Sequence, residues 1–310
     1  MTKEKTIWDS RKALWNGIGT EIKKALSTEE ALQMAGLDWN VIQKDLFTED
    51  GEKIEGFKAN VKETDGTVLG IVSDKYVVVQ NKDAFSFVNL LFGKGLTFET
   101  MGSMKNGRSI FMVLRFPQEY IINGERITPY IVVSNSHDTT SSLRISVCPL
   151  RVTCANMLPL VLKHSKRSWA CIHAGNLDDK FELAKQTLQF AENYMSSLGE
   201  EFHELQNKQL TETKVLEIVN ELIPEPEDAS EQQKKNVRRL REDILFRYNF
   251  APDLVTLKHS AYRLVNSVAD HICHSKPVRE TKDYQTNLFQ KMAVENHPLL
   301  EKAYKLSLAA

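Results

Sequence analysis

The alternation of apolar and polar residues divides the chain into a first half rich in strands and a second half rich in helices. Between residues 41 and 80, three β-rich runs are separated by EDGEK and TDGT. Asp-Gly and Asn-Gly pairs between such runs are typical of tight hairpin turns, and two more pairs occur at Asn106-Gly107 and Asn123-Gly124. We therefore predict an α+β fold whose core is an antiparallel sheet of hairpins with packed helices.

Three segments of the first half have a helical pattern. STEEALQM can begin a helix at Ser27 or Thr28, with acidic residues near the positive helix end. NKDAFSFVNLLFG predicts a short helix that has Asn81 as its N-cap. VTCANMLPLVLKH changes from strand spacing to helical spacing, with Thr153 as a candidate cap and Pro159 near the start or at a kink.

The segment SNSHDTTSSLRISVCPLRVTCANM, residues 134–157, combines hydroxyls, a His-Asp pair, two arginines and two cysteines. Its centre alternates apolar side chains with polar or small ones, the first set being Leu143, Ile145 and Val147 and the second Arg144, Ser146 and Cys148. A period of two residues is typical of a half-buried strand. We predict a strand here that ends at Pro149.

The second half is dominated by a regular apolar seam. Its members recur at spacings of three and four residues over more than three heptads and are Phe181, Ala184, Leu188, Ala191, Met195, Leu198, Phe202 and Leu205. Such a seam requires a packing partner, either the later helix around VRRLREDILF or a second copy of the chain. Ser230 with Gln233 predicts a capping box for that later helix. We divide the chain into residues 1–40, a helical N-terminal segment, residues 41–176, a sheet core, and residues 177–310, a helical region.

Composition and targeting signals indicate an ordinary folded protein. The 310 residues are 42% hydrophobic and 26% charged, as in globular domains. Neither a run of about 18 apolar residues nor a secretory signal is present, so we expect a cytoplasmic protein without membrane contact. The four cysteines are too few and too irregular for a disulfide framework, which favours reduced thiols.

The charge is unevenly distributed although the chain as a whole carries −1. Residues 101–173 contain nine Lys or Arg and three acids, which gives +6 and leaves −7 for the rest. A basic middle flanked by acidic ends could bind phosphates. The alternative is that these basic residues lie on an ordinary solvent-exposed surface of mixed charge.

Catalytic and metal sites find little support in the motifs. Cys154 with His137, His164 or His173 has the atom types of a nucleophile and base, and Cys171 and His173 lie close enough in sequence to share a metal, but neither arrangement has a standard spacing. Only three acids in the basic region argue against a magnesium centre, and no phosphate-binding or dinucleotide-binding glycine motif is present. We predict no catalytic residues, no metal and no cofactor, and regard an enzyme as less favoured than a binding protein.

The basic residues are distributed in a way that suits a nucleic-acid backbone. The candidates sit at a hairpin tip, on the strand of the opening motif and around the segment that follows it, and they are Lys105, Arg108, Arg144, Arg151, Lys163, Lys166 and Arg167. Hydroxyls at 139–142 could add phosphate contacts, and Trp169 could either stack a base or be buried. His137-Asp138 would most simply fix a loop, and the basic run KKNVRRLR would be the outer face of a helix.

Several separate motifs resemble one known family. They are LGIVSDKYVVVQNKDAFSFVNLL, FETMGSMKNGRSIFMVLRFP, PYIVVSNSHDTTSSLRISVCPLRVTCANML, HAGN and AYRLVNSVADHICH. From about Leu14 to Leu308 the chain is similar to the phage/plasmid-like family known as domain of unknown function 932. The matched positions of the family pattern include Gln80, Asn81, Gly102, Asn135, Ser136, His137, Asp138, Arg144, Arg151, Cys154, Asn156, His173, Gly175 and Asn176. The family's Trp-His-Gly-Leu-Gly reads Trp15-Asn16-Gly17-Ile18-Gly19 here, which removes one histidine.

The resemblance implies a genetic context for the protein and no particular activity. The family belongs to mobile genetic elements, often beside genes that handle single-stranded DNA, and it has no established reaction. The order of helix, hairpin sheet and following helix is similar to phage single-strand annealing recombinases, although a shared fold does not fix a function. Asn135, His137, Asp138, Asn156 and His173 form the polar cluster of the family pattern.

We therefore expect binding, and annealing or recombination, of single-stranded nucleic acid, DNA above all, by a homo-oligomer encoded by a phage or plasmid. Arg144 and Arg151 would be the inner phosphate contacts. A second hypothesis is a factor that binds a host protein against defence, through the seam or the acidic C-terminal region. A third is a hydrolase built around His137, Asp138, Cys154 and His173.

Overall fold

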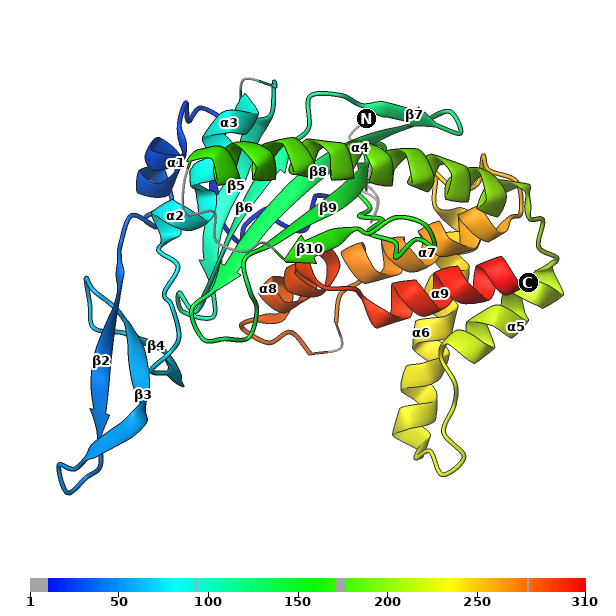
Figure 1. The fold of residues 1–310 in the computed structure, drawn as a ribbon. Coiled ribbons are helices and arrows are strands. Elements are labelled where there is room, and N and C mark those ends of the chain that lie inside the picture. The colour runs from blue at the N-terminus through cyan, green and yellow to red at the C-terminus, as the bar shows by residue number, and fades with distance from the viewer. Residues whose placement is uncertain (1–10, 93, 171–176, 278) are drawn as a thin grey trace, which may run out of the picture.

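The computed structural model describes residues 11–92, 94–170, 177–277 and 279–310 and has an α+β fold (Figure 1). Its centre is an antiparallel sheet of seven strands in the order β1-β5-β6-β8-β9-β10, with β7 also paired to β8. A second antiparallel sheet contains β2, β3 and β4 in that order. The predicted fold class is therefore confirmed.

Tight turns join two pairs of neighbouring strands in the main sheet. Their bounds are β1 Thr20–Glu21, β5 Thr97–Met104, β6 Ser109–Arg115, β7 Tyr120–Ile122, β8 Glu125–Ser136, β9 Arg144–Arg151 and β10 Ser168–Ala170. The backbone has positive φ angles at Asn106 (57°) and Gly107 (87°), and again at Asn123 (54°) and Gly124 (80°). These residue types tolerate the left-handed region, which explains why both predicted hairpin turns form.

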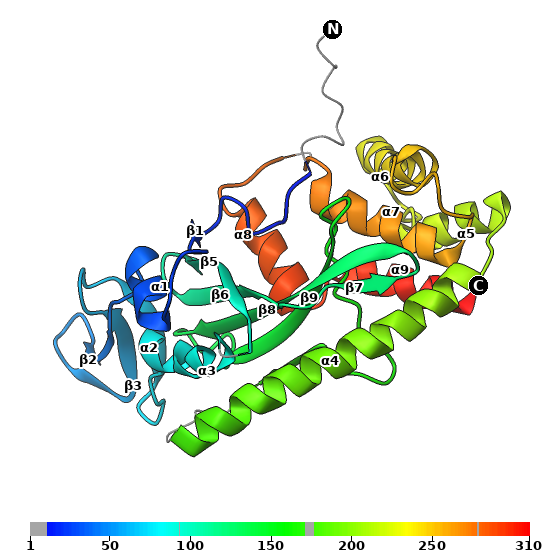
Figure 2. The ribbon, with the colours of Figure 1, turned by 90° about the horizontal axis from the view of Figure 1, so that it is seen from above.

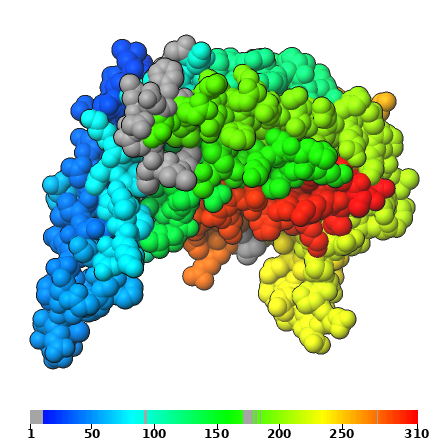
Figure 3. All heavy atoms as spheres, viewed as in Figure 1, coloured from blue at the N-terminus to red at the C-terminus, as the bar shows by residue number. Residues whose placement is uncertain are grey.

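The small sheet projects from one end of the molecule (Figures 1 and 3). It consists of β2 Val41–Phe47, β3 Lys53–Lys62 and β4 Val68–Ser73. The predicted meander over residues 41–80 is thus confirmed for its strands. Two bulges, between Asp45 and Phe47 and opposite Asn60 and Val61, shift the register and increase the local twist.

Helices cover both faces of the main sheet (Figure 2). One face carries α2 Asn81–Phe85, the 3-10 turn η1 Ser86–Val88, α3 Asn89–Phe92 and the long α4 Leu177–Asn207. The other face carries α8 Tyr284–Phe289 and the π-helical turn η2 Gln290–Val294. Aromatic contacts help to hold both layers on the sheet. The ring centroids of Trp169 in β10 and Phe190 in α4 are 4.7 Å apart, and those of Phe111 in β6 and Phe289 in α8 are 4.8 Å apart.

The apolar seam of α4 is covered within the chain. Ala191, Met195, Leu198, Phe202 and Leu205 are buried, and α4 packs on β7, β8 and β9 and on α7 Ala261–His274. The expectation that the later helix or a second copy covers the seam is wrong for these residues. A sheet face and a helix supply the same apolar contact as a coiled-coil partner. The side chains of Phe181 and Ala184 lie outside the description.

The remaining helices form a layer at the other end of the sheet. They are α5 Glu212–Leu222, α6 Glu231–Phe250 and α9 Pro298–Ala309, with α7 packed between α6 and α9, while α1 Thr28–Met34 lies near the small sheet. The capping box of α6 is confirmed, since the Ser230 side chain accepts from the Gln233 backbone and the Gln233 side chain accepts from the Ser230 backbone. Like the small sheet, α6 projects from the body (Figures 1 and 3).

The helix predicted after Thr153 does not form. The Arg151 amide donates to the Asn156 carbonyl at 3.0 Å, and the Leu158 amide donates to Pro149 at 2.9 Å. The chain thus folds back on the end of β9 through a turn in which Ala155 has a φ of 56°. Local pairing with a strand satisfies these backbone groups, and Pro159 could not donate within a helix.

Asn81 does not cap its helix. Gln80 is the N-cap residue of α2, and the Asn81 side chain donates instead to the carbonyl of Leu37 at 2.9 Å. Its oxygen lies 3.0 Å from His137 Nε2. The Asn81 side chain therefore forms tertiary hydrogen bonds, although its position in the sequence favours a helix cap.

The motif Asn-Ser-His-Asp at residues 135–138 attaches the small sheet to the main sheet. Asn60 of β3 donates to the His137 carbonyl at 2.7 Å, and the Tyr76 hydroxyl donates to the Ser136 carbonyl at 3.2 Å. Gly70 of β4 lies so close to the motif that a Cβ atom there would be 2.7 Å from the Asp138 Cα atom. This junction depends on the backbone carbonyls of Ser136 and His137 as acceptors and on the absence of a side chain at Gly70.

We expect Gly70→Ala to lower the free energy of unfolding by about 1–3 kcal/mol, because the added methyl group forces the two backbones apart. Urea unfolding measures the change. Gly199→Ala is the matched control, since a Cβ atom at Gly199 in α4 meets nothing within 4 Å. There, alanine should stabilise the helix by about 0.5–1 kcal/mol. Equal stability of Gly70→Ala and the unmodified protein would contradict the close packing.

Candidate functional site

The seven cations predicted to bind nucleic acid lie in three places. Lys105 and Arg108 occupy the turn between β5 and β6. Arg144 begins β9 and Arg151 ends it, so they lie at opposite ends of an eight-residue strand, roughly 23 Å apart along the chain. The other three belong to the segment before β10 and are Lys163, Lys166 and Arg167.

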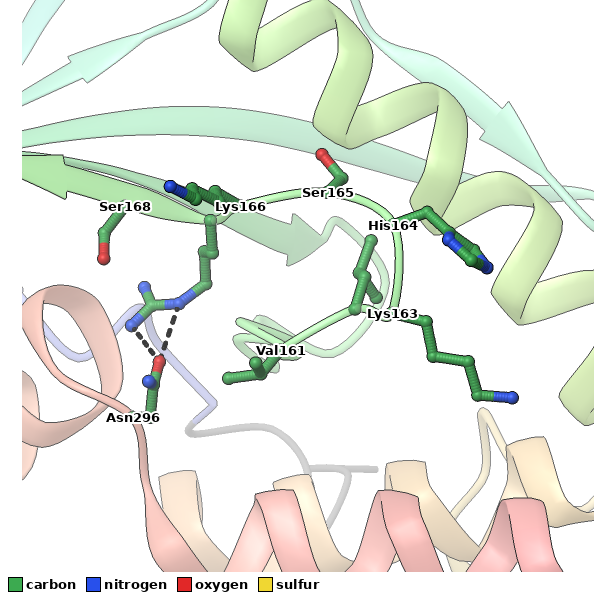
Figure 4. Close-up of a pocket in the computed structure, with 9 residues that line it drawn as sticks. Val161, Lys163, His164, Ser165, Lys166, Ser168 and Asn296 are labelled. Atoms are coloured by element: carbon green, nitrogen blue, oxygen red, sulfur yellow. Dashed lines mark hydrogen bonds between the residues drawn. The ribbon is translucent and has the colours of Figure 1, made fainter.

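A pocket of about 380 Å³ lies along this last segment (Figure 4). Residues 161–168 and Asn296 line it, and none of them is a carboxylate. Lys163, His164 and Lys166 are exposed, and Ser165 and Ser168 add hydroxyl groups. We call this cavity the basic pocket, and its lining has the chemistry of an anion site.

Arg167 forms the inner wall of the basic pocket. It is 3% exposed and donates to the Asn296 side chain at 2.9 Å and to the Ala293 carbonyl at 3.1 Å. Figure 4 shows the side chains of Lys163 and His164 extending away from Asn296. Burial lowers the pKa of Arg167, and the neighbouring charge of Arg144 lowers it further. Arg167 therefore holds the pocket segment on η2 and is not a free outer contact as predicted.

Arg144 borders the same pocket. It is half-buried, and its Nη1 atom donates to the Ser168 hydroxyl at 3.4 Å. Among the described residues it forms no ion pair with a carboxylate. Its charge, unlike that of Arg151, is not neutralised by an acidic neighbour in this part of the chain.

Arg151 cannot serve as the predicted phosphate contact. Its side chain is 1% exposed and pairs with Asp253 at 2.8 Å and with both carboxylate oxygens of Glu125. A phosphate could reach it only after these two ion pairs were broken, which would leave the Glu125 carboxylate uncompensated. The expectation for this residue is wrong.

A network of buried charges extends from Arg151 through the helical layer. Arg11 pairs with Asp253 at 2.6 Å and with Asp270 at 2.8 Å, and Arg247 pairs with Asp270 at 2.5 Å. Arg247 also pairs with Asp243 at 2.8 Å. We call these residues, with Glu125 and Arg151, the ion network. It brings together the sequence motifs CPLRVTCANM and AYRLVNSVADHICH, which are far apart along the chain.

The pKa values of the network follow from its pairing. Burial would raise the pKa of Asp253, but Arg151 and Arg11 reverse this and hold it below its usual value. For Asp243, contacts with His271, Arg247 and Ser275 likewise overcome burial and lower the pKa. The carboxylates stay charged because compensating cations surround them.

Thiol chemistry is not supported at this network. Cys154 lies 3.3 Å from Arg151 Nη1, but burial raises the pKa of its thiol to about 12. A thiol in that state is not a nucleophile near neutral pH. His137 follows β8 and Cys154 follows β9, which places them at opposite ends of these antiparallel strands. The residues proposed for a hydrolase are therefore not brought together, and His173 lies outside the described residues.

The polar cluster of the family pattern has structural contacts. His137 is fully buried, its ring lies edge-on to Trp39 at 5.6 Å, and burial lowers its pKa to about 4. Asp138 accepts hydrogen bonds from the amide and hydroxyl of Thr140, at 3.1 and 2.5 Å. Asn135 and Asn156 are buried too. The loop-fixing interpretation of His137-Asp138 agrees with these contacts.

Two further properties concern only the described residues. None of their His, Cys, Asp and Glu side chains form a group of three or more that could hold a metal ion. None of their helices is long and apolar enough to cross a membrane.

Comparison with known proteins identifies the family. Residues 68–293, most of the chain, match the model of the domain of unknown function DUF932, and the chain belongs to that family. No curated protein and no solved structure matches it.

Sequence reasoning missed the acidic members of the ion network. Glu125 and Asp253 lie in turn-like segments that gave no signal for burial. Asp270 had a signal, because it is the one acid within the amphipathic stretch AYRLVNSVADHICH. A carboxylate on the apolar side of such a helix is buried only with a cationic partner. That rule could have led to the expectation that an arginine such as Arg11 pairs with Asp270.

We expect Arg151→Met to lower the free energy of unfolding by about 3–5 kcal/mol, because it leaves Glu125 without its cation and Asp253 with Arg11 alone. Arg126→Met is the matched control on the neighbouring strand. Arg126 is 59% exposed and pairs with Glu119, so its loss should cost at most about 1 kcal/mol. Chemical unfolding of both variants measures the difference, and similar costs would argue against a tightly coupled network.

The protein should lose stability as the pH falls from about 6.5 to about 4. Burial lowers the pKa of His137, His274 and His297 to about 4, whereas the unfolded chain binds these protons near pH 6.5. The unfolded state is thus favoured progressively over that window.

Urea unfolding at pH 7.5, 6.0 and 5.0 would test this dependence. In His137→Gln, the free energy of unfolding should fall with decreasing pH less steeply than in the unmodified protein, by about 1 kcal/mol per pH unit. His203→Gln, at an exposed position, should keep the slope of the unmodified protein. An unchanged slope in His137→Gln would show that His137 is not held neutral.

Proposed function

We propose that the protein binds single-stranded nucleic acid through its phosphates, with Lys163, Lys166 and Arg144 as the main contacts. The observation that carries this proposal is the lining of the basic pocket, which contains cations and hydroxyl groups and no carboxylate. Positive groups that are not neutralised by neighbours attract a polyanion and release its counterions. Arg151 has no part in binding, and Arg167 acts by holding the segment in place.

The contacts are expected to be with the backbone and not with bases. The residues that line the pocket include no Phe, Tyr or Trp on which a base could stack. Trp169, the nearest in sequence, packs against Phe190. Lysines and serine hydroxyls are typical phosphate donors, so binding should be nearly independent of sequence.

A flexible strand suits the distribution of cations better than a duplex. The basic pocket is a small cavity beside β10, and Lys105 and Arg108 lie at the far turn of β5 and β6. A single strand can bend into the cavity and still reach that turn, whereas a stiff duplex resists bending. We further propose annealing of complementary strands as the reaction served, on the expectation of a phage or plasmid setting.

The test is binding of a labelled single-stranded oligonucleotide at several salt concentrations. Lys163→Ala with Lys166→Ala should weaken binding at low salt and reduce the slope of log affinity against log salt by about 1.4, because each lost phosphate contact contributes about 0.7. Duplex DNA and single-stranded RNA are the competitors that define the substrate.

Lys24→Ala with Lys258→Ala is the matched control. Both lysines are exposed and lie outside the pocket lining, so this variant should keep the affinity and slope of the unmodified protein. Equal effects of the two double substitutions would mean that only net charge matters. No binding by the unmodified protein at low salt would overturn the proposal.

A further inference from the structure

Two arginine side chains beside the basic pocket have no acidic partner. Arg144 is half-buried, Arg167 is buried, and the positive charge of Arg144 lowers the pKa of Arg167. In the described part of the chain, Arg167 donates to neutral acceptors, the Asn296 side chain and the Ala293 carbonyl, and neither guanidinium pairs with a carboxylate. Two cations shielded from water without a counter-charge favour the binding of an anion.

The strand register places hydroxyl groups on both sides of Arg144. Ser134 of β8 is its direct partner across the strands, and such partners have Cβ atoms about 5 Å apart. On the other side, Ser168 of β10 accepts from Arg144 Nη1 at 3.4 Å. Ser146 lies two residues after Arg144 and thus on the same face, and its hydroxyl donates to a backbone carbonyl of η2 at 3.5 Å. Arg144 and the two flanking hydroxyls therefore face η2, on which Arg167 is held.

The hydroxyl group of Ser134 lacks a hydrogen-bond partner. Ser134 is 5% exposed, and its Oγ atom is buried without a hydrogen bond to any described residue. Burying a hydroxyl in this way costs free energy, which a ligand with an oxygen acceptor recovers. We call four residues the inner anion site, and they are Ser134, Arg144, Arg167 and Ser168. They are less exposed than the lysines of the basic pocket.

The charge of the inner anion site distinguishes two kinds of phosphate. A phosphodiester inside a strand carries one negative charge, whereas a phosphate at a strand end carries about 1.5–2 near neutral pH and has three strong acceptor oxygens. Two guanidinium groups without acidic neighbours match the second kind more closely. The end of a strand also needs only one path into a buried site, whereas an internal phosphate needs room for the chain on both sides.

We propose that the inner anion site binds the phosphate group at the end of a nucleic-acid strand, while Lys163 and Lys166 contact the next phosphates of the backbone. This inference rests on the proposed function and specifies its substrate as a strand with a phosphorylated end. Arg144 contacts the terminal phosphate through its planar fork of donors, and the Ser134 hydroxyl donates to one of the phosphate oxygens. Arg167 adds its charge while it remains in its contacts with η2.

Binding of three labelled oligonucleotides of one sequence tests this inference at low salt. One carries a 5′-phosphate, one a 3′-phosphate, and one has hydroxyl groups at both ends. The unmodified protein should bind one of the phosphorylated strands roughly tenfold more tightly than the unphosphorylated strand, because hydrogen bonds to a charged group are strong. A calorimetric titration with inorganic phosphate shows whether a free anion of the same chemistry binds as well.

Ser134→Ala should lower the ratio of the two affinities roughly threefold, because it removes one donor to the terminal phosphate. The variant should be at least as stable to urea as the unmodified protein, since the lost hydroxyl has no partner in the described fold. Ser307→Ala is the matched control. Ser307 of α9 is also fully buried with an unpartnered hydroxyl but lies outside the inner anion site, so this variant should keep the ratio of the unmodified protein.

The outcomes separate this inference from the proposed function. Equal affinity for all three strands would overturn the inference and leave the proposed function standing, whereas absence of binding by every strand would overturn both. A preference for a phosphorylated end that Ser134→Ala retains in full would place the phosphate elsewhere. Binding of inorganic phosphate without any preference among the strands would assign the inner anion site to a free anion, which also contradicts the inference.

Discussion

Compensation of buried charge at Arg151 is the constraint on which the rest of this structure depends. The side chain ends β9 in a nearly inaccessible position, and burying a guanidinium without partners would cost far more than a domain's stability allows. Glu125 from β8 and Asp253 from the segment after α6 therefore have to converge on it. Asp253 in turn needs Arg11, and the pairing continues to α7. The sheet and the helical layer are thus fixed to each other by charge as well as by apolar contact.

The same constraint positions the basic pocket. Most of its lining, residues 161–168, lies on the stretch of chain between Arg151 and Arg167, and both arginines are buried in fixed contacts. Between these two anchors, Lys163 and Lys166 remain exposed. Arginine and lysine differ here as their chemistry predicts. Arginine forms several directed hydrogen bonds in a buried site, whereas lysine remains hydrated at the surface. Four cations that look equivalent along the chain therefore have two different roles.

The proposed activity depends on one small pocket. A single pocket contacts only a short piece of a strand, so its affinity alone would be modest and strongly dependent on salt. The small sheet, in turn, is held at its junction with the main sheet by Asn60 and Gly70.

The sequence by itself determined the local elements of this protein. Asn-Gly and Asp-Gly pairs specified the hairpins, and the capping box specified the start of α6, because each of these signals acts over a few residues. Alternation specified most of β9, which continues two residues past its predicted end at Pro149. The apolar seam of α4 could be recognised, but whether a sheet or another helix would cover it could not. Only the tertiary structure decided that Asn81 binds His137, that residues after Thr153 pair with β9, and that Arg151 is neutralised while Arg144 is not. Those outcomes depend on partners that are distant in sequence, such as Asp253, and composition around one residue carries no information about them.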